Sequence, residues 1–342
     1  MVTEYIINQT LQKDFHNKTS WNHSLKQFSE NNIFQSYEWG ELKESEGWKP
    51  LRIIISDSES LETILIGQIL IKKIFGVSIA WCPGGPLIKS KSKENILAAL
   101  DKFKESIAEY DVANLRCKTF MQDNNINREF FDIFIKPKHV MTSRKTSIIE
   151  IKSEDDFLKQ IKKKHRYYIK QSEKSNIDWK VEESKEADKT FTNIYEEMQK
   201  TKHLNLPIVN IALFSKLLDN NNDVRSKAFT FSGFENKAVV SSCLISIFDN
   251  KAFYHYAAST ERGREISASY GMIFNLYKYL KQQDVSQLDF GGLSEDGSSA
   301  GVDFFKEGFN GITVNRIGEF DIAKSKIHNY LFNKAIKFKN KK

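Results

Sequence analysis

One stretch near the end of the sequence, residues 289–311 (DFGGLSEDGSSAGVDFFKEGFNG), combines residue types that could take part in chemistry. It holds six of the 16 glycines of the chain, an aspartate directly after a strand-like run, Asp289, and a single lysine, Lys306. Such a stretch could be a phosphate cradle, a hinge or a glycine-rich turn. It is not a Walker loop, because the lysine of that motif directly follows the last glycine of the cradle. A hinge or a turn remains.

Residue sets typical of hydrolases and metal sites are missing from the sequence. The seven histidines occupy unrelated contexts, and no Gly-x-Ser-x-Gly elbow accompanies them. Neither a His-x-x-x-His nor a Cys-x-x-Cys spacing is found, so we predict no metal site. The three cysteines lie far apart in strand-like apolar contexts, and we interpret them as buried thiols without a disulfide framework.

Length and composition predict a folded chain of two domains. The sequence has 342 residues, of which 40% are hydrophobic, and domains usually hold roughly 150 residues. No apolar run approaches the length of a membrane span, and the first residues, MVTEYIINQTLQKDF, carry charges and amides where a signal peptide is apolar. We therefore expect a cytoplasmic protein.

Two lysine-rich segments account for the basic character of the chain, whose net charge is +7. The basic segment, residues 159–174, carries six lysines and one arginine against one glutamate. The basic tail, residues 324–342, carries seven lysines and no acidic residue. Such patches attract anionic partners, although solvated helix faces have the same composition. In the tail, Ile327, Leu331 and Ala335 share one side, which suits either a helix resting on the inner face of an anionic membrane or one docked on its own domain.

Hydrophobic periodicity predicts two successive α/β units with the same order of elements: a helix, an antiparallel meander, a helix and a strand. The first unit has a helix at 35–47, strands at 51–56, 62–74 and 77–82, a helix at 92–110 and a strand at 112–118. The second has a strand at 145–152, helices at 153–161 and 187–204, three strands within 227–260, a helix at 269–283, and strands at 286–292 and 312–322. Because the strands come in hairpins, the pattern excludes a Rossmann fold. We expect the boundary between the two units near Arg144.

The second unit has the element order of a GNAT (acyl-CoA N-acyltransferase) fold. Enzymes of that kind hold the pyrophosphate of CoA with a turn of small residues at a helix N-terminus. At the matching place Gly263 is followed by Arg264, Glu265 and Ile266, so the small-residue turn is missing. The architecture fits this fold, whereas the usual CoA pocket does not.

Four segments together resemble the FemABX family, the non-ribosomal peptidyltransferases that build peptidoglycan cross-bridges. The residues that carry the resemblance stand in family order: Gln35, Ser36, Trp39 and Lys43; Lys164, Arg166, Ile169, Lys170, Glu173 and Lys174; the strand FYHYAAST at 253–260; and Asp289, Phe290, Gly291, Gly292, Phe305, Lys306, Gly308, Phe309 and Gly311. The long antiparallel helical arm of some staphylococcal members has no counterpart in this chain. Relatives with the same signature also occur in surface-polysaccharide and natural-product pathways.

The resemblance implies two tandem GNAT-like domains with mostly antiparallel mixed sheets, at residues 1–144 and 145–323, followed by the basic tail at 324–342. It implies an aminoacyl-tRNA donor, no resident cofactor, and an amine acceptor on a UDP-linked or lipid-linked muropeptide or another cell-surface precursor. An aminoacyl ester is already activated, so the enzyme must position the amine and stabilise the oxyanion, and it needs no covalent nucleophile.

The resemblance also implies roles for individual residues. Lys306, held on a tight loop, would face the oxyanion or the phosphates of the tRNA acceptor end, and Asp289 would orient the amine or cap the loop. The remaining candidates are substrate-binding residues: Trp39, Lys43, Arg166, Tyr254, Tyr256 and Tyr270. Among these, Lys43 would bind an acceptor diphosphate, and Arg166 would pair bidentately with phosphate.

Tyr254 and Tyr256 alternate along a strand, so they are expected to share one face and either stack on a base or sugar or belong to an aromatic core.

Two other functions are compatible with the sequence. One is an acyl-CoA-dependent N-acyltransferase that acts on an amino sugar of a surface polysaccharide. The other is a non-catalytic protein that binds tRNA or other RNA through the basic segment.

Overall fold

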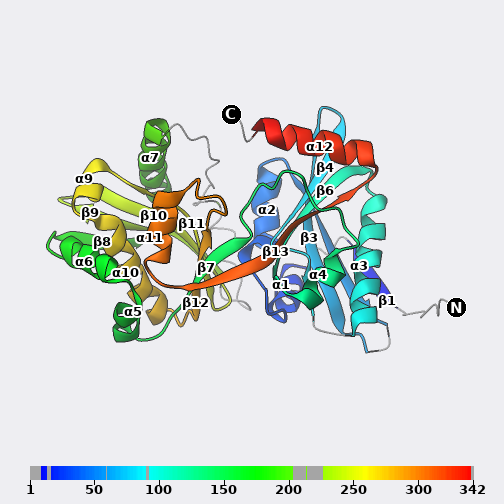
Figure 1. Ribbon diagram of the computed structural model, residues 1–342, viewed down its shortest axis with the longest axis horizontal. Coiled ribbons are helices and arrows are strands. Elements are labelled where there is room, and N and C mark those ends of the chain that lie inside the picture. The colour runs from blue at the N-terminus through cyan, green and yellow to red at the C-terminus, as the bar shows by residue number, and fades with distance from the viewer. Residues whose placement is uncertain are drawn as a thin grey trace. The chain divides into compact units, whose positions relative to one another are not determined.

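The computed structural model describes residues 9–13, 17–58, 60–89, 92–202, 213 and 226–339. The chain divides into two compact units (Figure 1). Unit 1 comprises residues 1–144 and 315–342, and unit 2 comprises residues 145–314. The ends of the predicted helix at 187–204 and of the basic tail lie outside the described residues.

Unit 1 is a mixed sheet with helices on both faces. Its strands are β1 (Gln9–Lys13), β2 (Lys49–Asp57), β3 (Thr63–Ile74), β4 (Val77–Pro83), β5 (Leu87–Ile88), β6 (Val112–Gln122) and most of β13 (Ile312–Ala323). The order is β1-β2-β3-β4-β6-β13, with β5 on β3; all described pairs are antiparallel except the parallel pair β4–β6. The helices are α1 (Lys18–Lys26), η1 (Ile33–Gln35), α2 (Tyr37–Ser45), α3 (Lys93–Ala108), α4 (Asn125–Phe131) and α12 (Lys326–Lys339).

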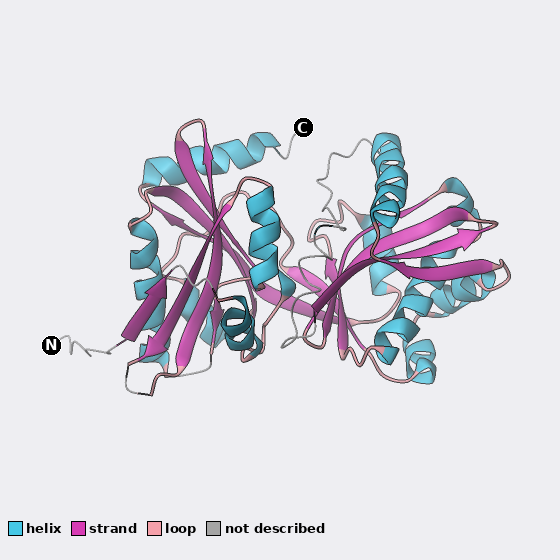
Figure 2. Ribbon diagram, turned by 180° about the vertical axis from the view of Figure 1, so that it is seen from behind, coloured by secondary structure: helices cyan, strands magenta, loops and turns pink. Residues whose placement is uncertain are grey.

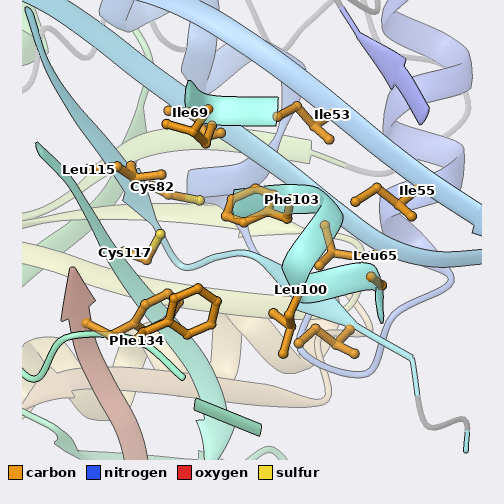
Figure 3. Close-up of a cluster of buried hydrophobic side chains, with 14 of the residues drawn as sticks. Ile53, Ile55, Leu65, Ile69, Cys82, Leu100, Phe103, Leu115, Cys117 and Phe134 are labelled. Atoms are coloured by element: carbon orange, nitrogen blue, oxygen red, sulfur yellow. The ribbon is translucent and has the colours of Figure 1, made fainter. Parts of the chain in front are cut away.

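The core of unit 1 lies between the sheet and helices α3 and α4. Phe103 and Leu100 of α3 pack against isoleucines of β2 and β3 (Figure 3). Cys82 and Cys117, paired in register on β4 and β6, lie in the same core. All three cysteines are buried and free, which confirms their interpretation as buried thiols.

Unit 2 repeats this arrangement (Figure 2). Its strands are β7 (Lys145–Glu150), β8 (Ile177–Glu182), β9 (Ser226–Glu235), β10 (Ala238–Phe248), β11 (Lys251–Ser259) and β12 (Gln287–Gly292), in the order β7-β12-β11-β10-β9-β8. Only β11–β12 is parallel among these described pairs. Its helices include α5 (Glu154–Gln160), α6 (Lys163–Ser172), α7 (Lys185–Lys202), α9 (Glu261–Glu265), α10 (Ala268–Gln282) and α11 (Ala300–Glu307).

The structure differs from the sequence prediction in two places that bear on function. We predicted a second domain at 145–323 and a separate tail at 324–342. In the structure, the chain from 315 onward belongs to unit 1, including most of β13 and all of α12. Lys306, expected on a tight loop, lies in the last turn of helix α11. Glycines lie on both sides of this helix, and because glycine has a low helix propensity, the sequence did not predict a helix here.

Among the described residues, no helix is long and apolar enough to cross a membrane. The same residues contain no group of three or more histidine, cysteine, aspartate or glutamate side chains placed to hold a metal ion.

Candidate active site

The site in unit 2 is built where strands β11 and β12 part. Their parallel pairing runs from Lys251↔Gln287 to Phe253↔Asp289, and β11 continues to Ser259 without a β12 partner in the described register. Asp289 is buried, and its Oδ1 accepts hydrogen bonds from the Thr146 hydroxyl and from the amide of Gly291, the latter at 2.9 Å. Gly291 has φ +76°, a conformation that favours glycine. Asp289 therefore fixes the turn at which β12 ends.

Lys306 brings its ammonium group to this turn. Its Nζ donates to the carbonyl oxygen of Gly292 at 2.7 Å. Burial lowers the pKa of Lys306, and the carboxylates of Asp289 and Asp303 oppose that shift. The structure thus brings Lys306 and Asp289 together, 17 positions apart in the sequence, and places a half-buried cation at the parting of two strands.

Helix α11, which carries Lys306, is held at both ends. At its start, Asp303 accepts hydrogen bonds from the hydroxyl of Ser294 and from the Ser294 amide, the latter at 2.9 Å. At its end, the Lys162 amide donates to the Gly308 carbonyl at 2.9 Å. Gln160 Nε2 donates to the next two carbonyls at 3.1 Å each. The basic segment is therefore bound to the end of the Lys306 helix by one backbone hydrogen bond and by the side chain of Gln160.

His165, which sequence reasoning did not single out, lies under this helix. It is fully buried, and its Nε2 is 3.0 Å from the Phe305 carbonyl oxygen, so Nε2 carries the proton and donates. Its Nδ1 has no hydrogen-bond partner among the described residues. Burial lowers the pKa of His165, and Lys162 and Lys164 add to this, whereas the bond to Phe305 opposes it. His165 thus supports the backbone directly before Lys306.

Aromatic rings surround the same place. Tyr270 lies 4.5 Å from Tyr168 and 5.1 Å from Phe305 between ring centroids, and burial raises the pKa of its hydroxyl. Tyr254 meets Phe290 edge-on at 5.1 Å, and burial raises its pKa as well. Two of the predicted tyrosines therefore lie on the unit 2 core beside the Lys306 helix.

Tyr256 does not share a face with Tyr254, so that prediction was wrong. The register shifts between Leu244 and Ile245, which pair with Tyr256 and Tyr254, respectively. This bulge at the intervening residue turns Tyr256 to the other face, where its ring lies 5.6 Å from Tyr195 of α7. Strict alternation along the strand could not reveal an extra residue in the ladder.

Arg166 forms hydrogen bonds with backbone carbonyls. Its Nη1 donates to the carbonyl oxygens of Ile161 at 2.5 Å and Leu158 at 3.1 Å. These groups lie at the end of helix α5, where carbonyls lack helical partners. This nitrogen therefore has a capping role in the structure.

An exposed aromatic surface is formed by helices α6 and α11. The Nζ of Lys164 is 5.1 Å from the ring centroid of Phe304 and 5.9 Å from that of Tyr168. Phe304 and the neighbouring Tyr167 are exposed, although both are large rings. Rings of this kind beside lysines can stack on nucleobases while the lysines face phosphate.

A second cluster lies within unit 1 and contains the two other predicted residues. Lys43 Nζ stands 4.8 Å from the ring centroid of Trp39 and is bound to the carboxylate of Glu46 at 2.9 Å. Trp39 is buried and continues into a row of rings, because Phe34 lies edge-on to it at 5.0 Å and to Phe120 at 6.0 Å. Two further cations cover the last ring, namely Arg316 at 3.8 Å and Lys118 at 5.8 Å.

Sequence reasoning missed Lys118 and Arg316. The two residues are brought together by the antiparallel pair β6–β13, whose strands are some 200 residues apart in the chain (Lys118 pairs with Glu319). No local signal in the sequence predicts that pairing.

Two amides of the turn expected to hold a CoA pyrophosphate have partners within the protein. The amide of Gly263 donates to the Thr260 hydroxyl at 3.1 Å, and the Arg264 amide donates to the Thr260 carbonyl at 3.1 Å. The amides of Gly263 and Arg264 are therefore used within the turn itself.

Comparisons with known proteins show similarity to one family and to one fold. Residues 214–337 match the model of the FemAB family. Lipid II:glycine glycyltransferases from two strains of Staphylococcus epidermidis are each 30% identical over 86 residues, which is 24% of this chain and 21% of those proteins. The chain thus matches about a fifth of the length of these curated relatives. The resemblance to the FemABX family is confirmed.

Two solved structures share the fold. The crystal structure of FemX superposes with a TM-score of 0.78 at 16% identity, covering 94% of this chain and 100% of that one. A tandem GNAT protein from the clavulanic acid biosynthesis pathway gives 0.57 at 7% identity, covering 93% and 100%. The predicted tandem GNAT-like fold with mostly antiparallel mixed sheets is therefore confirmed.

Proposed function

From the FemAB family match and the FemX-like fold of the chain, we propose that this protein is an aminoacyltransferase that acts on a peptidoglycan precursor. The donor is an aminoacyl-tRNA, and the acceptor is an amine on a lipid-linked or UDP-linked muropeptide. The lipid-linked form is supported by the staphylococcal relatives, which are lipid II:glycine glycyltransferases. No resident cofactor or metal ion is required by this reaction.

The observation that carries the proposal is the placement of Lys306. Its ammonium group is half-buried at the parting of β11 and β12 and donates to one described acceptor, Gly292. Two N–H protons are thus left for a ligand. When the acceptor amine attacks the ester carbonyl, the carbonyl oxygen gains negative charge, and the Lys306 ammonium stabilises it. The amine proton leaves with the tRNA hydroxyl as the ester bond breaks.

Asp289 acts in this scheme as a positioning residue. Its carboxylate binds Thr146 and the Gly291 amide, and it favours the charged form of Lys306. Tyr254 and Tyr270 form apolar walls that exclude water from the ester. Dry surroundings strengthen the attraction between ammonium and oxyanion.

The 3′ end of the donor RNA is proposed to lie on the exposed rings of unit 2. Phe304 and Tyr167 offer faces for unpaired bases, and Lys164, whose ammonium lies 5.1 Å from the Phe304 ring centroid, offers charge for phosphate. Phe304 and Lys306 both belong to helix α11, so this helix carries a ring of the proposed RNA surface and the proposed oxyanion donor. Arg166 contributes here by capping α5, and Tyr256, on the far face, has no proposed substrate contact.

The diphosphate of the acceptor is proposed to bind the cations of unit 1. Lys43, Lys118 and Arg316 flank a row of rings that includes Trp39. An incoming diphosphate would displace Glu46 from Lys43, and the rings offer faces for a base or sugar.

The test is a transfer assay with a panel of donors. Purified protein is given charged tRNA pools or acyl-CoAs, together with UDP-linked and lipid-linked muropeptides, and the acceptor mass is measured. We expect one aminoacyl residue to be added from tRNA, and Lys306→Ala to remove the product. Transfer from acyl-CoA instead of tRNA, or to no muropeptide in the panel, would refute the proposal.

The same panel separates the non-catalytic RNA-binding alternative. That function predicts tight tRNA binding with no product, unaffected by Lys306→Ala and abolished by charge reversal of Lys162, Lys163 and Arg166. Product formation that depends on Lys306 contradicts it.

A further inference from the structure

Helix α12 is docked in unit 1 by its polar side. Asn329 Nδ2 donates to Asp321 Oδ2 at 2.8 Å and to Asn114 Oδ1 at 2.9 Å. Asn333 donates to the same Asp321 oxygen at 3.2 Å and accepts from Arg116 at 3.2 Å. The helix is therefore held by a buried polar network in which its asparagines face inward.

The opposite side of α12 is apolar and faces outward. Ile327 is 71% exposed and Leu331 is 55% exposed, and Tyr330 beside them is exposed as well. Lys326 and Lys334 flank this side and are also exposed. Ile336 of the same helix is buried, whereas Ile327, Tyr330 and Leu331 form an exposed apolar group, and such a group suits a partner outside unit 1.

The turn between β3 and β4 presents a second apolar group. Phe75 is fully exposed, and Ile74 and Val77 on either side are exposed too. Phe75 has φ +47°, so a bulky residue occupies a turn position that suits glycine or asparagine better. Lys73 directly precedes the group.

The turn and the helix lie at the same end of unit 1. Ser78 of β4 pairs with Val112, and Lys324 just before α12 is bound to the neighbouring Asp111 at 2.5 Å. The hydrogen bond from Lys324 lowers the pKa of Asp111, and the charges of His328 and Lys73 contribute. Both ribbon views show the β3–β4 turn beside α12 (Figures 1 and 2).

We propose that this end of unit 1 binds the surface of an anionic phospholipid bilayer. The lipid-facing surface is defined by six exposed apolar residues and four exposed lysines: Ile74, Phe75, Val77, Ile327, Tyr330, Leu331, Lys73, Lys324, Lys326 and Lys334. Phe75 and the apolar side of α12 enter the headgroup region, while the lysines stay at the level of the lipid phosphates. The inference goes beyond the transfer reaction and stands on separate residues.

The chemistry favours a bilayer over RNA or a protein partner. Four of the six apolar residues are aliphatic, and aliphatic side chains do not stack on bases. Asp111 at this end is bound to Lys324, and the three other lysines of the surface, Lys73, Lys326 and Lys334, are exposed. Apolar side chains that project from a turn and a helix among lysines suit insertion between lipids.

Vesicle co-sedimentation of the full chain tests the proposal without donor or acceptor. The vesicles are phosphatidylcholine alone, or phosphatidylcholine with a third phosphatidylglycerol. We expect the unchanged protein to bind the anionic vesicles. Lys326→Glu should lower the partition coefficient by about fivefold or more, since each lysine near such a surface contributes on the order of 1 kcal/mol. Phe75→Ser together with Leu331→Ser should abolish binding.

Two controls are matched to these variants. Leu61→Ser removes an apolar residue that is 74% exposed at the opposite end of β3, and Lys104→Glu reverses an exposed lysine on α3. Both should bind like the unchanged protein, and thermal unfolding should be the same for all variants because every changed side chain is exposed.

Several results would overturn the proposal. They are equal binding to neutral and anionic vesicles, no binding to either, and equal losses in the controls and the surface variants. Self-association in sedimentation velocity that Phe75→Ser removes would instead assign this surface to a second copy of the chain. RNA binding lost in the same variant would assign it to RNA.

Discussion

Replacing His165 tests whether a neutral histidine supports the Lys306 helix. The side chain is fully buried, donates to the Phe305 carbonyl, and touches four other aromatic rings. His165→Ala removes that hydrogen bond, worth about 1 kcal/mol, and leaves a cavity, so we expect a loss of about 3 kcal/mol in the free energy of unfolding. His165→Gln keeps an N–H near the position of Nε2 and should lose about 1 kcal/mol.

The same residue predicts a pH dependence. The folded protein holds the pKa of His165 below its ordinary value of 6.5, chiefly through burial. Below pH 6.5 the unfolded chain therefore binds more protons than the folded one, so stability is fully present above that pH and falls as the pH drops through the folded pKa. The slope is at most about 1.4 kcal/mol per pH unit.

The assay is urea unfolding at a series of pH values for the unchanged protein, His165→Ala and His165→Gln. The difference between the unchanged protein and His165→Gln isolates this histidine from the six others. If both lose stability equally on acidification, His165 is not the group that titrates. If His165→Ala unfolds within about 0.5 kcal/mol of the unchanged protein, the packing argument is wrong.

Two further predictions follow from packing in each unit, and urea unfolding measures both. Gly308→Ala should destabilise unit 2 strongly, because an added Cβ would lie 1.8 Å from the His165 ring. The control is Gly301→Ala, whose added Cβ meets nothing within 4 Å and which should leave the free energy of unfolding unchanged or raise it. Equal effects of the two would contradict the contact. Arg116→Met should cost about 3–5 kcal/mol, because Asp321 and Glu319 stay buried without their cation. Arg128→Met, which removes an exposed partner of Asp123, should leave the midpoint unchanged, and a similar loss in both variants would refute the distinction.

Local patterns in the sequence predicted most elements of both units and the proximity of Lys306 to Asp289. Strand alternation and helix periodicity depend on neighbours within a few residues, so the meanders and the helices α3 and α10 could be placed. Their order predicted a duplicated α/β architecture, and the resemblance to the FemABX family implied the tandem GNAT-like fold.

The remaining features depend on contacts that local patterns do not encode. The pairing of β13 with β6, which brings Arg316 to Phe120 and docks α12 in unit 1, joins segments about 200 residues apart. The bulge that separates Tyr254 from Tyr256 is a single extra residue in a ladder. Arg166 was predicted as a phosphate ligand. Its carbonyl partners at the end of α5 can be recognised only from the three-dimensional structure.

The most direct test of the account is the rate constant for a single turnover from saturating aminoacyl-tRNA to a saturating muropeptide acceptor. Lys306→Ala should lower it by about 10²- to 10³-fold, the usual effect of removing one oxyanion donor, with donor binding unchanged. Lys278→Ala, which removes a lysine packed on Phe274 of the same unit, should leave it unaltered. A Lys306→Ala rate within about threefold of the unchanged protein would contradict the claim that this ammonium group stabilises the transition state.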